Sequence, residues 1–446
     1  MADQRKPIVT DRDIPEVAGQ YDRFPYPERR PEDERGRLIS TWLDDLRMIN
    51  HHCFRGEQTF DKNFRVLVAG GGTGDGTIFL AEQLRPLGGH VVHLDFSTAA
   101  LSVARERARI RGLRNIEWVE ASLLALPQLG LGTFDLINCV GVLHHLREPE
   151  QGLDALLEVL APEGAMALLV YARYGRTGVY QMQELLRRIN RDESDATVRL
   201  ARARATLAAL PRSNWFLRGE DLHRDHVEGG DAGLYDLLLH PQDRAYTVPE
   251  LYEWLTDRQG LTIEFSDWHR GMLPYLVEHY FEPRQPELLS LVRTYPAREQ
   301  HAIAELIGGD IATHSLFATR VSKSKATYGD LDFVPVFVNE KATGEDFVQL
   351  IERHNDLPFV LQHAQSRLQR RLDPGRFVKE IFRHMDGTRT FREIFNLVQQ
   401  PPLSPVPTEA QFWEEFRPWY AALETIERLV LRRPGAYQGL QGFSLR

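Results

Sequence analysis

A glycine-rich stretch at residues 65–76, RVLVAGGGTGDG, constrains the fold of the 446-residue chain more than any other feature. Its first five residues predict a short buried strand of the kind found in parallel sheets. The glycines that follow tolerate positive φ and leave no Cβ between the backbone and a ligand. Because a helical pattern resumes at residues 78–84, the stretch predicts the entrance of a nucleotide-binding βαβ unit.

A second predicted strand carries an acidic residue at its tip. Residues 90–94, HVVHL, end in Asp95, and Ser97 is placed to cap a helix that begins near Thr98. A carboxylate in this position can accept hydrogen bonds from both hydroxyls of a ribose. The sequence therefore predicts an adenosine-containing ligand.

The spacing of the glycines separates two kinds of cofactor site. Gly70, Gly72 and Gly74 follow the pattern Gly-x-Gly-x-Gly, whereas a dinucleotide site needs Gly-x-Gly-x-x-Gly. Gly76 lies close by, so spacing alone leaves both kinds open. The stretch resembles motif I of the class I S-adenosylmethionine-dependent methyltransferases. It departs from that motif at Val68, where many members carry a carboxylate that faces the amino group of the cofactor.

Two later segments continue this resemblance. Residues 115–120 predict a third strand and residues 133–140 a fourth. After the third strand, Ser122 stands where the family usually has a carboxylate at the adenine edge. After the fourth, GVLHHL at residues 141–146 resembles the most specific phrase of the family. The resemblance implies S-adenosyl-L-methionine as cofactor and S-adenosyl-L-homocysteine as product. The residues that it assigns to the cofactor are Gly70, Gly72, Gly74, Asp95, Phe96, Ser122, Leu123 and Cys139.

The adjacent pair His144 and His145 offers two chemical interpretations. Imidazoles bind metal ions and act as general bases near neutral pH. In the family that the chain resembles, the pair packs or lines the pocket, and no third metal ligand is evident, so no metal is expected. Methyl transfer depends mainly on positioning and needs a base only if the acceptor is protonated. The catalytic residue is left open, with His145, Tyr171 and His240 as candidates.

Strands and helices alternate from residue 64 to about residue 172, as in a doubly wound α/β sheet. Pro162-Glu163-Gly164 predicts a turn before a fifth strand at residues 165–171. Residues 311–321 predict a last, antiparallel strand, and residues 181–260 predict a helical insert. The expected fold class is a Rossmann-like class I methyltransferase sheet with helical insertions, plus a small, mainly α, winged-helix-like C-terminal domain.

Residues 21–31, YDRFPYPERRP, form a proline-rich arm ahead of the glycine loop. Three prolines prevent a regular helix, so an extended segment is expected. The arm either packs on the core or closes over the pocket as a lid, and a similar Pro-Tyr-Pro arm occurs in a subset of bacterial methyltransferases. The loop after the fifth strand is also expected on the substrate side, because carboxyl ends of strands face the ligand. The substrate-side candidates are Tyr21, Tyr26, Arg173, Tyr174 and Arg176.

A change of pattern near residue 326 predicts a further domain. The expected division is an arm and helical cap at residues 1–60, a methyltransferase domain at 61–325 and a mainly helical domain at 326–446. The Asp-Gly-Thr turn at residues 386–388, followed by a helix, resembles winged-helix modules of certain bacterial protein methyltransferases. Pro335 limits the strand around it to the edge of a sheet.

Composition excludes several classes of protein. The chain has 54 Lys and Arg against 63 Asp and Glu, a net charge of −9, which argues against generic nucleic-acid binding. Cys53 and Cys139 provide neither a disulfide framework nor metal-type spacing. No apolar run approaches the roughly 20 residues of a membrane span, and the first residues lack the apolar core of a signal peptide. A cytoplasmic protein without membrane association is expected.

The resemblance implies transfer of a methyl group from S-adenosylmethionine to a nucleophile (EC 2.1.1.-). The expected acceptor is a protein, a peptide or an amino-acid-like molecule, because the arm and the C-terminal region resemble parts of bacterial protein methyltransferases. The alternatives are a small-molecule methyltransferase of specialised metabolism and a non-catalytic regulatory protein that binds the cofactor. An open groove beside residues 171–180 would favour a polypeptide acceptor, and a sealed apolar chamber would favour a metabolite. The sequence does not predict the oligomeric state.

Overall fold

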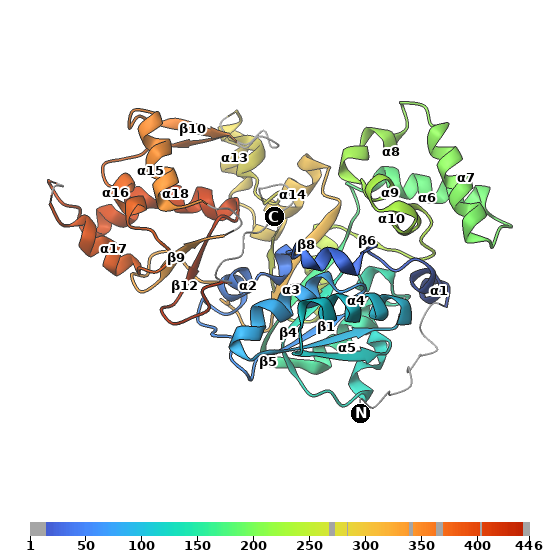
Figure 1. The fold of residues 1–446 in the computed structure, drawn as a ribbon. Coiled ribbons are helices and arrows are strands. Elements are labelled where there is room, and N and C mark those ends of the chain that lie inside the picture. Colours follow the sequence, from blue (N-terminus) through green and yellow to red (C-terminus); the bar gives the residue numbers. More distant parts are fainter. Residues whose placement is uncertain are drawn as a thin grey trace. The chain divides into compact units, whose positions relative to one another are not determined.

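The computed structural model describes residues 15–266, 273–282, 284–338, 342–362, 369–401 and 404–439. The chain forms two compact units (Figure 1). The first contains residues 1–44, 61–263 and 305–320, and the second contains residues 45–60, 264–304 and 321–446. This division is not the linear one expected from the sequence, since two segments that precede residue 305 group with the C-terminal residues.

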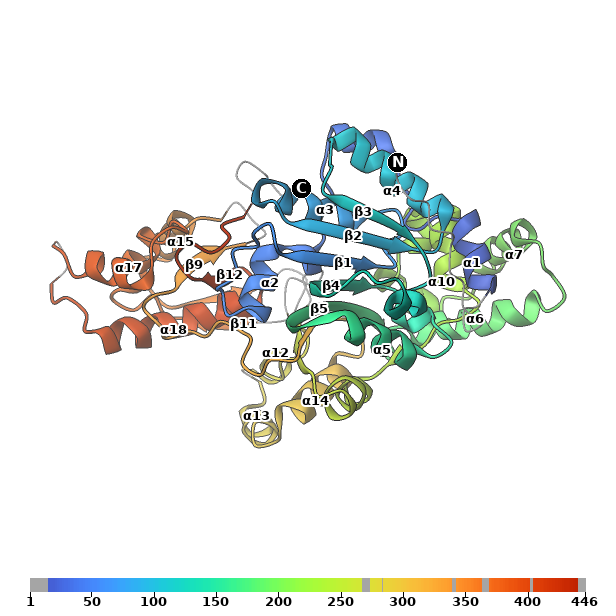
Figure 2. The ribbon, with the colours of Figure 1, turned by 90° about the horizontal axis from the view of Figure 1, so that it is seen from below.

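The first unit is built on a mixed sheet with the strand order β3-β2-β1-β4-β5-β8-β7, and β6 pairs with β5 (Figure 2). Strands β1 to β5 are parallel neighbours, and β8 runs antiparallel to β5. The expected Rossmann-like α/β fold is therefore confirmed, including its antiparallel strand near the end of the sheet. The strands are β1 (Arg65–Ala69), β2 (His90–Asp95), β3 (Ile116–Glu120), β4 (Phe134–Val140), β5 (Leu160–Ala172), β6 (Ala245–Tyr246), β7 (Thr262–Phe265) and β8 (Thr313–Thr319).

Strand β5 begins earlier than the sequence predicts. The segment Pro162-Glu163-Gly164 was expected to be a turn, but it lies inside β5. The register between β4 and β5 shifts there, because Phe134 pairs with Leu160 while Leu136 pairs with Ala165. The proline and glycine therefore mark a bulge in a long strand, which is a common place for both residues.

Helices cover both faces of the sheet. In Figure 2, α3 and α4 lie on one side of the sheet and α5 on the other. Ser97 caps α4 as expected, accepting a hydrogen bond from the Ala100 N–H at 3.2 Å. The helices and short 3-10 turns of this part are α3 (Asp75–Leu84), η3 (Arg85–Leu87), α4 (Thr98–Arg111), η4 (Leu123–Gln128), η5 (Leu143–His145) and α5 (Pro149–Val159). Helix α14 (Ala297–Gly308) begins in the second unit and ends in the first.

The helical insert expected after β5 is present. It has its own apolar core, formed around Val179, Leu186 and Leu234. A capping box at Thr247 and Glu250 begins its helix α11. Its elements are α6 (Thr177–Ile189), α7 (Ala196–Ala208), α8 (Trp215–Arg218), η6 (Glu220–Leu222), α9 (Asp225–Glu228), α10 (Gly230–Leu238), α11 (Val248–Leu251) and the π-helix η7 (Tyr252–Arg258).

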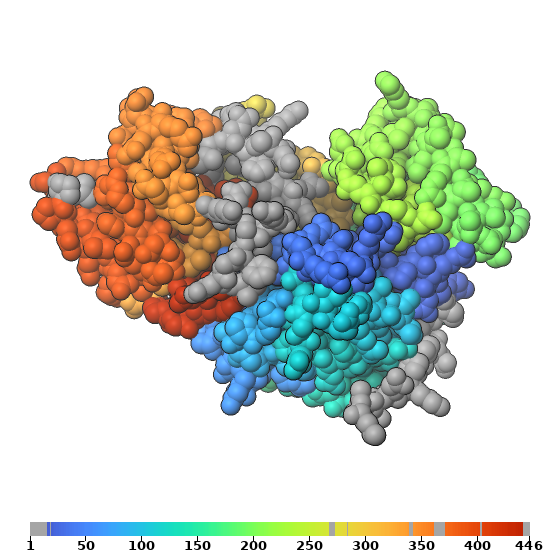
Figure 3. All heavy atoms as spheres, in the orientation of Figure 1, coloured from blue at the N-terminus to red at the C-terminus, as the bar shows by residue number. Residues whose placement is uncertain are grey.

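The N-terminal segment begins with α1 (Pro15–Arg23), continues as the extended arm and includes η1 (Pro31–Arg35) and η2 (Trp42–Asp44). Figure 3 shows this segment, in dark blue, lying between the green helical insert and the cyan residues around α4. The helical cap expected within residues 1–60 is helical only in short pieces, because η1, η2 and α2 (Leu46–Cys53) are separated by non-helical residues.

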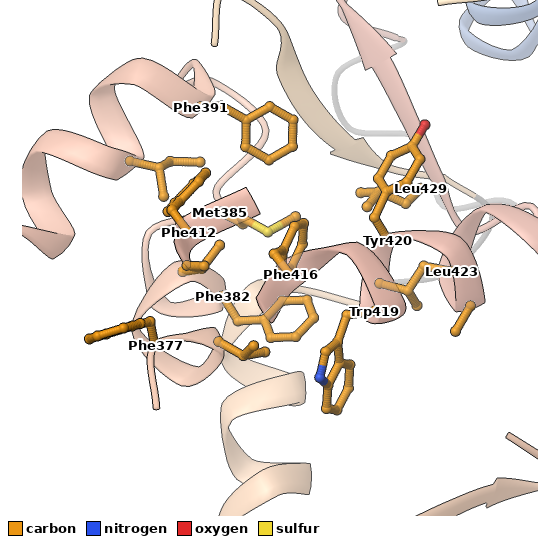
Figure 4. Close-up of a cluster of buried hydrophobic side chains, with 14 of the residues drawn as sticks. Phe377, Phe382, Met385, Phe391, Phe412, Phe416, Trp419, Tyr420, Leu423 and Leu429 are labelled. Atoms are coloured by element: carbon orange, nitrogen blue, oxygen red, sulfur yellow. The ribbon is translucent and has the colours of Figure 1, made fainter. Parts of the chain in front are cut away.

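The second unit is mainly helical, as expected for the C-terminal region. Its core packs aromatic side chains of α16, α17 and α18 against one another, with Trp419 fully buried (Figure 4). Strand β9, which contains Pro335, pairs only with β12 among the described strands, in agreement with an edge position. The likeness to winged-helix modules is not confirmed. Its elements include α12 (Glu278–Phe281), α13 (Pro286–Val292), β9 (Val334–Phe337), α15 (Gly344–Arg353), β10 (Phe359–Gln362), β11 (Gln369–Leu372), α16 (Val378–Arg383), α17 (Phe391–Val398), α18 (Glu409–Thr425) and β12 (Leu429–Arg432).

Candidate active site

The glycine loop between β1 and α3 lies directly beneath the N-terminal arm. Gly72 has φ +52°, and a Cβ added to it would lie 2.6 Å from the carbonyl oxygen of Tyr26. A side chain at this position would therefore collide with the backbone of the arm and would strain its own backbone. Glycine is needed here for the approach of the arm as well as for the turn.

Asp95, at the tip of β2, points at the glycine loop. Its Oδ2 accepts the N–H of Gly72 at 2.7 Å, and its Oδ1 accepts the N–H of Ser97 at 2.8 Å. Burial raises the pKa of Asp95 to about 6, although the backbone hydrogen bonds work in the opposite direction. The carboxylate is thus held against the glycine loop, where the sequence predicts the ribose.

Backbone and side-chain contacts attach the arm to the glycine loop. The hydroxyl of Thr73 donates to the carbonyl of Pro27 at 2.7 Å. Arg29 makes a two-pronged ion pair with Asp75, with Nε at 3.0 Å from Oδ1 and Nη2 at 2.6 Å from Oδ2. The arm therefore packs closely on the glycine loop, in agreement with the first interpretation of the sequence. A lid over the pocket stays a prediction.

A buried guanidinium supports the same loop from α4. Arg107 donates from Nη1 to the carbonyl of Thr73 at 2.8 Å and to Asp75 at 2.7 Å. Its Nε donates to Glu34 of η1 at 2.8 Å, and the Arg107 and Glu34 side chains are almost fully buried. Because each charge is paired and hydrogen-bonded, the removal of one partner would leave an uncompensated charge in the interior.

Other predicted cofactor residues lie at the carboxyl ends of β2, β3 and β4. Ser122 is buried and caps η4, accepting the N–H of Leu124 at 3.2 Å. Phe96 is half-buried and lies edge-on to Tyr21, with ring centroids 6.3 Å apart. Burial raises the pKa of Cys139 to about 12, so its side chain is a neutral thiol. Their contacts with a cofactor stay a prediction.

The three catalytic candidates meet in one cluster. The rings of His145 and His240 stack with centroids 3.9 Å apart, and His145 lies perpendicular to Tyr171 at 5.5 Å. Tyr21 of α1 adds its ring at 5.9 Å from His240. Buried His145 of η5 and buried His240 after α10 therefore lie with half-buried Tyr171 of β5 and Tyr21 of α1 in one group of polar side chains, called here the His145 cluster.

Asp236 is the member of the His145 cluster that sequence reasoning missed. It is buried in α10, where its Oδ1 accepts the Tyr21 hydroxyl at 2.9 Å and its Oδ2 accepts the Tyr171 hydroxyl at 3.3 Å. A single acid within the apolar run YDLLLH, residues 235–240, was the available signal. A carboxylate in such a run is buried with its helix face and needs partners.

The other predicted substrate residues do not all lie together. One belongs to the His145 cluster, and the others lie outside it. Arg176 is buried, with its guanidinium carbon 3.5 Å from the centroid of Tyr171. Arg173 instead pairs with Glu250 at 2.7 Å, and the side chain of Tyr174 is 36% exposed. The hydroxyl of Tyr26 donates a hydrogen bond to Asp225 of the insert at 3.1 Å.

Burial determines the charge of the His145 cluster. Desolvation lowers the pKa of His145, which Asp236 partly offsets, and it lowers the pKa of His240 well below the usual value. Desolvation also raises the pKa of Asp236 and of Tyr21. Near neutral pH the two imidazoles are therefore neutral, as a base or a hydrogen-bond acceptor must be.

A family model matches part of this domain, and a solved structure shares its fold. Residues 67–166, which run from β1 into β5, match the family model described as a methyltransferase domain. The solved structure of PKMT2 from Rickettsia typhi superimposes with a TM-score of 0.62 at 14% identity, over 89% of this chain and 77% of that one. At that identity the likeness concerns the fold, and it extends over most of both chains.

This chain spans about half the length of the relatives that it matches by sequence. An uncharacterised protein of Synechococcus sp. is 38% identical over 209 residues, 46% of this chain and 49% of its own. The demethylmenaquinone methyltransferase of Thermus thermophilus is 36% identical over 107 residues, 24% of this chain and 47% of its own. The mitochondrial ubiquinone biosynthesis O-methyltransferase of Schizosaccharomyces pombe is 30% identical over 142 residues, 30% of this chain and 46% of its own. Among the described residues, no helix has the length and apolarity required to cross a membrane.

Proposed function

We propose that the protein is an S-adenosylmethionine-dependent methyltransferase that acts on a nucleophile of a protein, peptide or amino-acid-like substrate. The observation that carries the proposal is the Asp95 carboxylate, held against the glycine loop of a methyltransferase domain. When bound, S-adenosylmethionine supplies an electrophilic methyl group. The structure of PKMT2 from Rickettsia typhi in complex with AdoHcy, which has the same fold, supports this choice of cofactor.

The residues present fit such a cofactor. Oδ2 of Asp95 accepts the Gly72 N–H and Oδ1 accepts the Ser97 N–H. A carboxylate has about four lone-pair sites, so it can accept a further hydrogen bond from a ribose hydroxyl. Gly141, just beyond β4, has φ +77°, and a Cβ added to it would meet no atom within 4 Å. Open space therefore adjoins the carboxyl end of β4, where the sulfur is expected. In this proposal Gly70, Gly72 and Gly74 admit the methionine portion, while Ser122 and Leu123 bind the adenine.

The acceptor class rests on the resemblance of the arm and the C-terminal region to bacterial protein methyltransferases. A small metabolite is the second candidate, and a specific observation favours it. Tyr171 and Arg176 lie among side chains of the N-terminal segment and the insert, not along an exposed surface. Two relatives are named for steps of ubiquinone and menaquinone chemistry, which also have small acceptors.

Calorimetry with S-adenosylmethionine and S-adenosylhomocysteine tests cofactor binding. Replacement of Asp95 by Ala should weaken both by 10- to 100-fold, since lost hydrogen bonds to a charged group cost about 1.5–3 kcal/mol. Asp192→Ala, an exposed acid of the insert, is the matched control and should leave the affinity unchanged. An Asp95→Ala protein with wild-type affinity would refute the ribose assignment.

Methyl transfer itself is tested with methyl-labelled S-adenosylmethionine and a bacterial lysate. Label in protein or peptide, located by mass spectrometry, supports the first acceptor class, and label confined to small molecules supports the second. Binding of the cofactor without any labelled product would identify a non-catalytic binding protein instead.

A further inference from the structure

The main-chain N–H and C=O of a single residue, Gln242, fix the proton positions on both imidazoles of the His145 cluster. The carbonyl of Gln242 lies 2.9 Å from Nδ1 of His145, and a carbonyl oxygen only accepts, so Nδ1 carries the proton. The N–H of Gln242 donates to Nδ1 of His240 at 3.1 Å, so this nitrogen bears the lone pair. A neutral imidazole has one N–H, and the two rings are therefore opposite tautomers.

The partners of His240 and Asp236 are accounted for by this assignment. Nε2 of His240 carries the proton and faces the Tyr21 oxygen at 3.4 Å. The Tyr21 hydroxyl in turn donates to Asp236, whose second oxygen accepts from Tyr171. The carboxylate is thus held between two phenols that each donate to it.

His145 is left with the free lone pair. Its Nε2 has no hydrogen-bond partner among the residues that the structure describes. One nitrogen of His145, one of His240 and one oxygen of Asp236 all lie within 4.8 Å of one another. A proton placed on His145 would therefore form an imidazolium close to a carboxylate, and that arrangement stabilises it.

We infer that Nε2 of His145 is the general base for a neutral acceptor that carries its own proton, namely a hydroxyl, a phenol or an amine. The inference rests on the proposed function. As the bond from the acceptor atom to the methyl carbon forms and the sulfur–carbon bond breaks, the acceptor proton passes to His145, which later releases it to water. His240 and Asp236 are positioning residues. A weak base suffices, because the acceptor atom becomes acidic as it is methylated.

A divalent metal site is the competing interpretation of the same three side chains. Two histidines and an acid are common ligands of such ions. A metal would require the Nε2 lone pair of His240, but the bond from the Gln242 N–H leaves the proton on that nitrogen. The tautomers favour acid–base chemistry over coordination.

The pH dependence expected of this base is defined by its surroundings. His145 must be neutral, so single-turnover methyl transfer should rise with pH through a pKa below 6.5 and then level off. Asp236 and Asp243 raise that pKa, while burial and Arg176 lower it. The titratable and charged groups that face the ring are Asp236 of α10, Tyr21 of α1, Tyr171 of β5, Arg176 before α6, His144 of η5, and His240 and Asp243 after α10.

Nitrogen-15 NMR of the histidine rings in the full chain tests the tautomers without any acceptor. The expected result is a proton on Nδ1 of His145 and on Nε2 of His240 at pH 7.5. His145→Asn, whose side-chain amide can still donate to Gln242, and His240→Gln assign the signals. A proton on Nε2 of His145, or a charged ring at pH 7.5, would overturn the inference.

Transfer assays complete the test. His145→Asn should bind S-adenosylmethionine within twofold of wild type yet lose 100-fold or more of the labelled transfer, with a flat pH profile. His90→Asn, a half-exposed histidine at the start of β2, is the matched control. Transfer within threefold of wild type in His145→Asn, or loss of transfer on addition of EDTA, would overturn the inference while leaving the methyltransferase proposal intact. If the wild-type protein binds the cofactor but labels nothing, both fail together.

Discussion

Two buried acids of the first unit have pKa values above those of the same side chains in water. Asp95 and Asp44 are both buried, and desolvation raises the pKa of each to about 6. Asp44 accepts hydrogen bonds from Asn138 and, at 2.5 Å, from Thr41. These carboxyl groups therefore change charge in a range where most acids of the protein are already ionised.

The raised pKa of Asp95 predicts pH-dependent cofactor binding. The ionised carboxylate accepts hydrogen bonds from ribose hydroxyls, so below pH 6 binding must first remove a proton. The dissociation constant for S-adenosylhomocysteine should then increase by up to about tenfold per pH unit as the pH falls. Calorimetry between pH 5 and 8 measures this. Asp95→Asn should bind weakly with little pH dependence, and Asp44→Asn should keep the slope; a flat wild-type profile would contradict the assignment.

At the scale of elements, the arm and the glycine loop form one structural feature. The arm is held by backbone contacts to residues 72–73, by the Arg29–Asp75 ion pair and by Tyr21 and Tyr26 at the insert. It therefore joins the glycine loop to the helical insert and to Asp236 of the His145 cluster. A substitution in the glycine loop should therefore displace the arm.

Gly72→Ala tests that connection. The added Cβ would meet the Tyr26 carbonyl at 2.6 Å, and the arm should be displaced. Faster proteolysis within residues 15–35 and at least tenfold weaker cofactor binding are expected. Gly112→Ala is the matched control, because Gly112 has a similar φ of +67° but open space around its Cβ, and should show only the backbone cost of about 1 kcal/mol. Equal behaviour of the two variants would count against a docked arm.

Much of the first unit could be predicted from local sequence. Apolar runs followed by glycine or an acid mark β1 and β2, and their order predicts the sheet. The position of Asp236 could not be predicted, because its partners Tyr21 and Tyr171 are brought to it only by the folded chain. The length of β5 was also missed, since a proline–glycine bulge has the same local signal as a turn.

At the scale of the whole molecule, the chain forms two units with separate cores. Residues 45–60 belong to the second unit, where His51 accepts the Leu431 N–H at 3.0 Å. Nothing in the local pattern predicts a contact across such a separation in sequence. A substitution in the core of one unit should therefore lower the unfolding free energy of that unit and leave that of the other unchanged.

Trp419→Ala tests the separation of the units. Trp419 is fully buried and donates to the Asp373 carbonyl at 2.8 Å, so the change should lower the unfolding free energy of the second unit by about 3–5 kcal/mol. Scanning calorimetry should show one transition moved to lower temperature, with S-adenosylmethionine affinity within twofold of wild type. Trp215→Ala removes the same side chain at a 56% exposed position and should change little. Loss of cofactor binding in Trp419→Ala would indicate that the units do not fold separately.

The role of the Gln242 main chain has a consequence for evolution. Gln242 touches both imidazoles through its main-chain atoms, whereas its own side chain takes no part in either bond. Selection that maintains the tautomers would accept nearly any amino acid at this position, and proline alone would abolish the donor. Relatives can therefore diverge at residue 242 and retain the same chemistry, and a search for invariant positions would overlook the group that directs the proton.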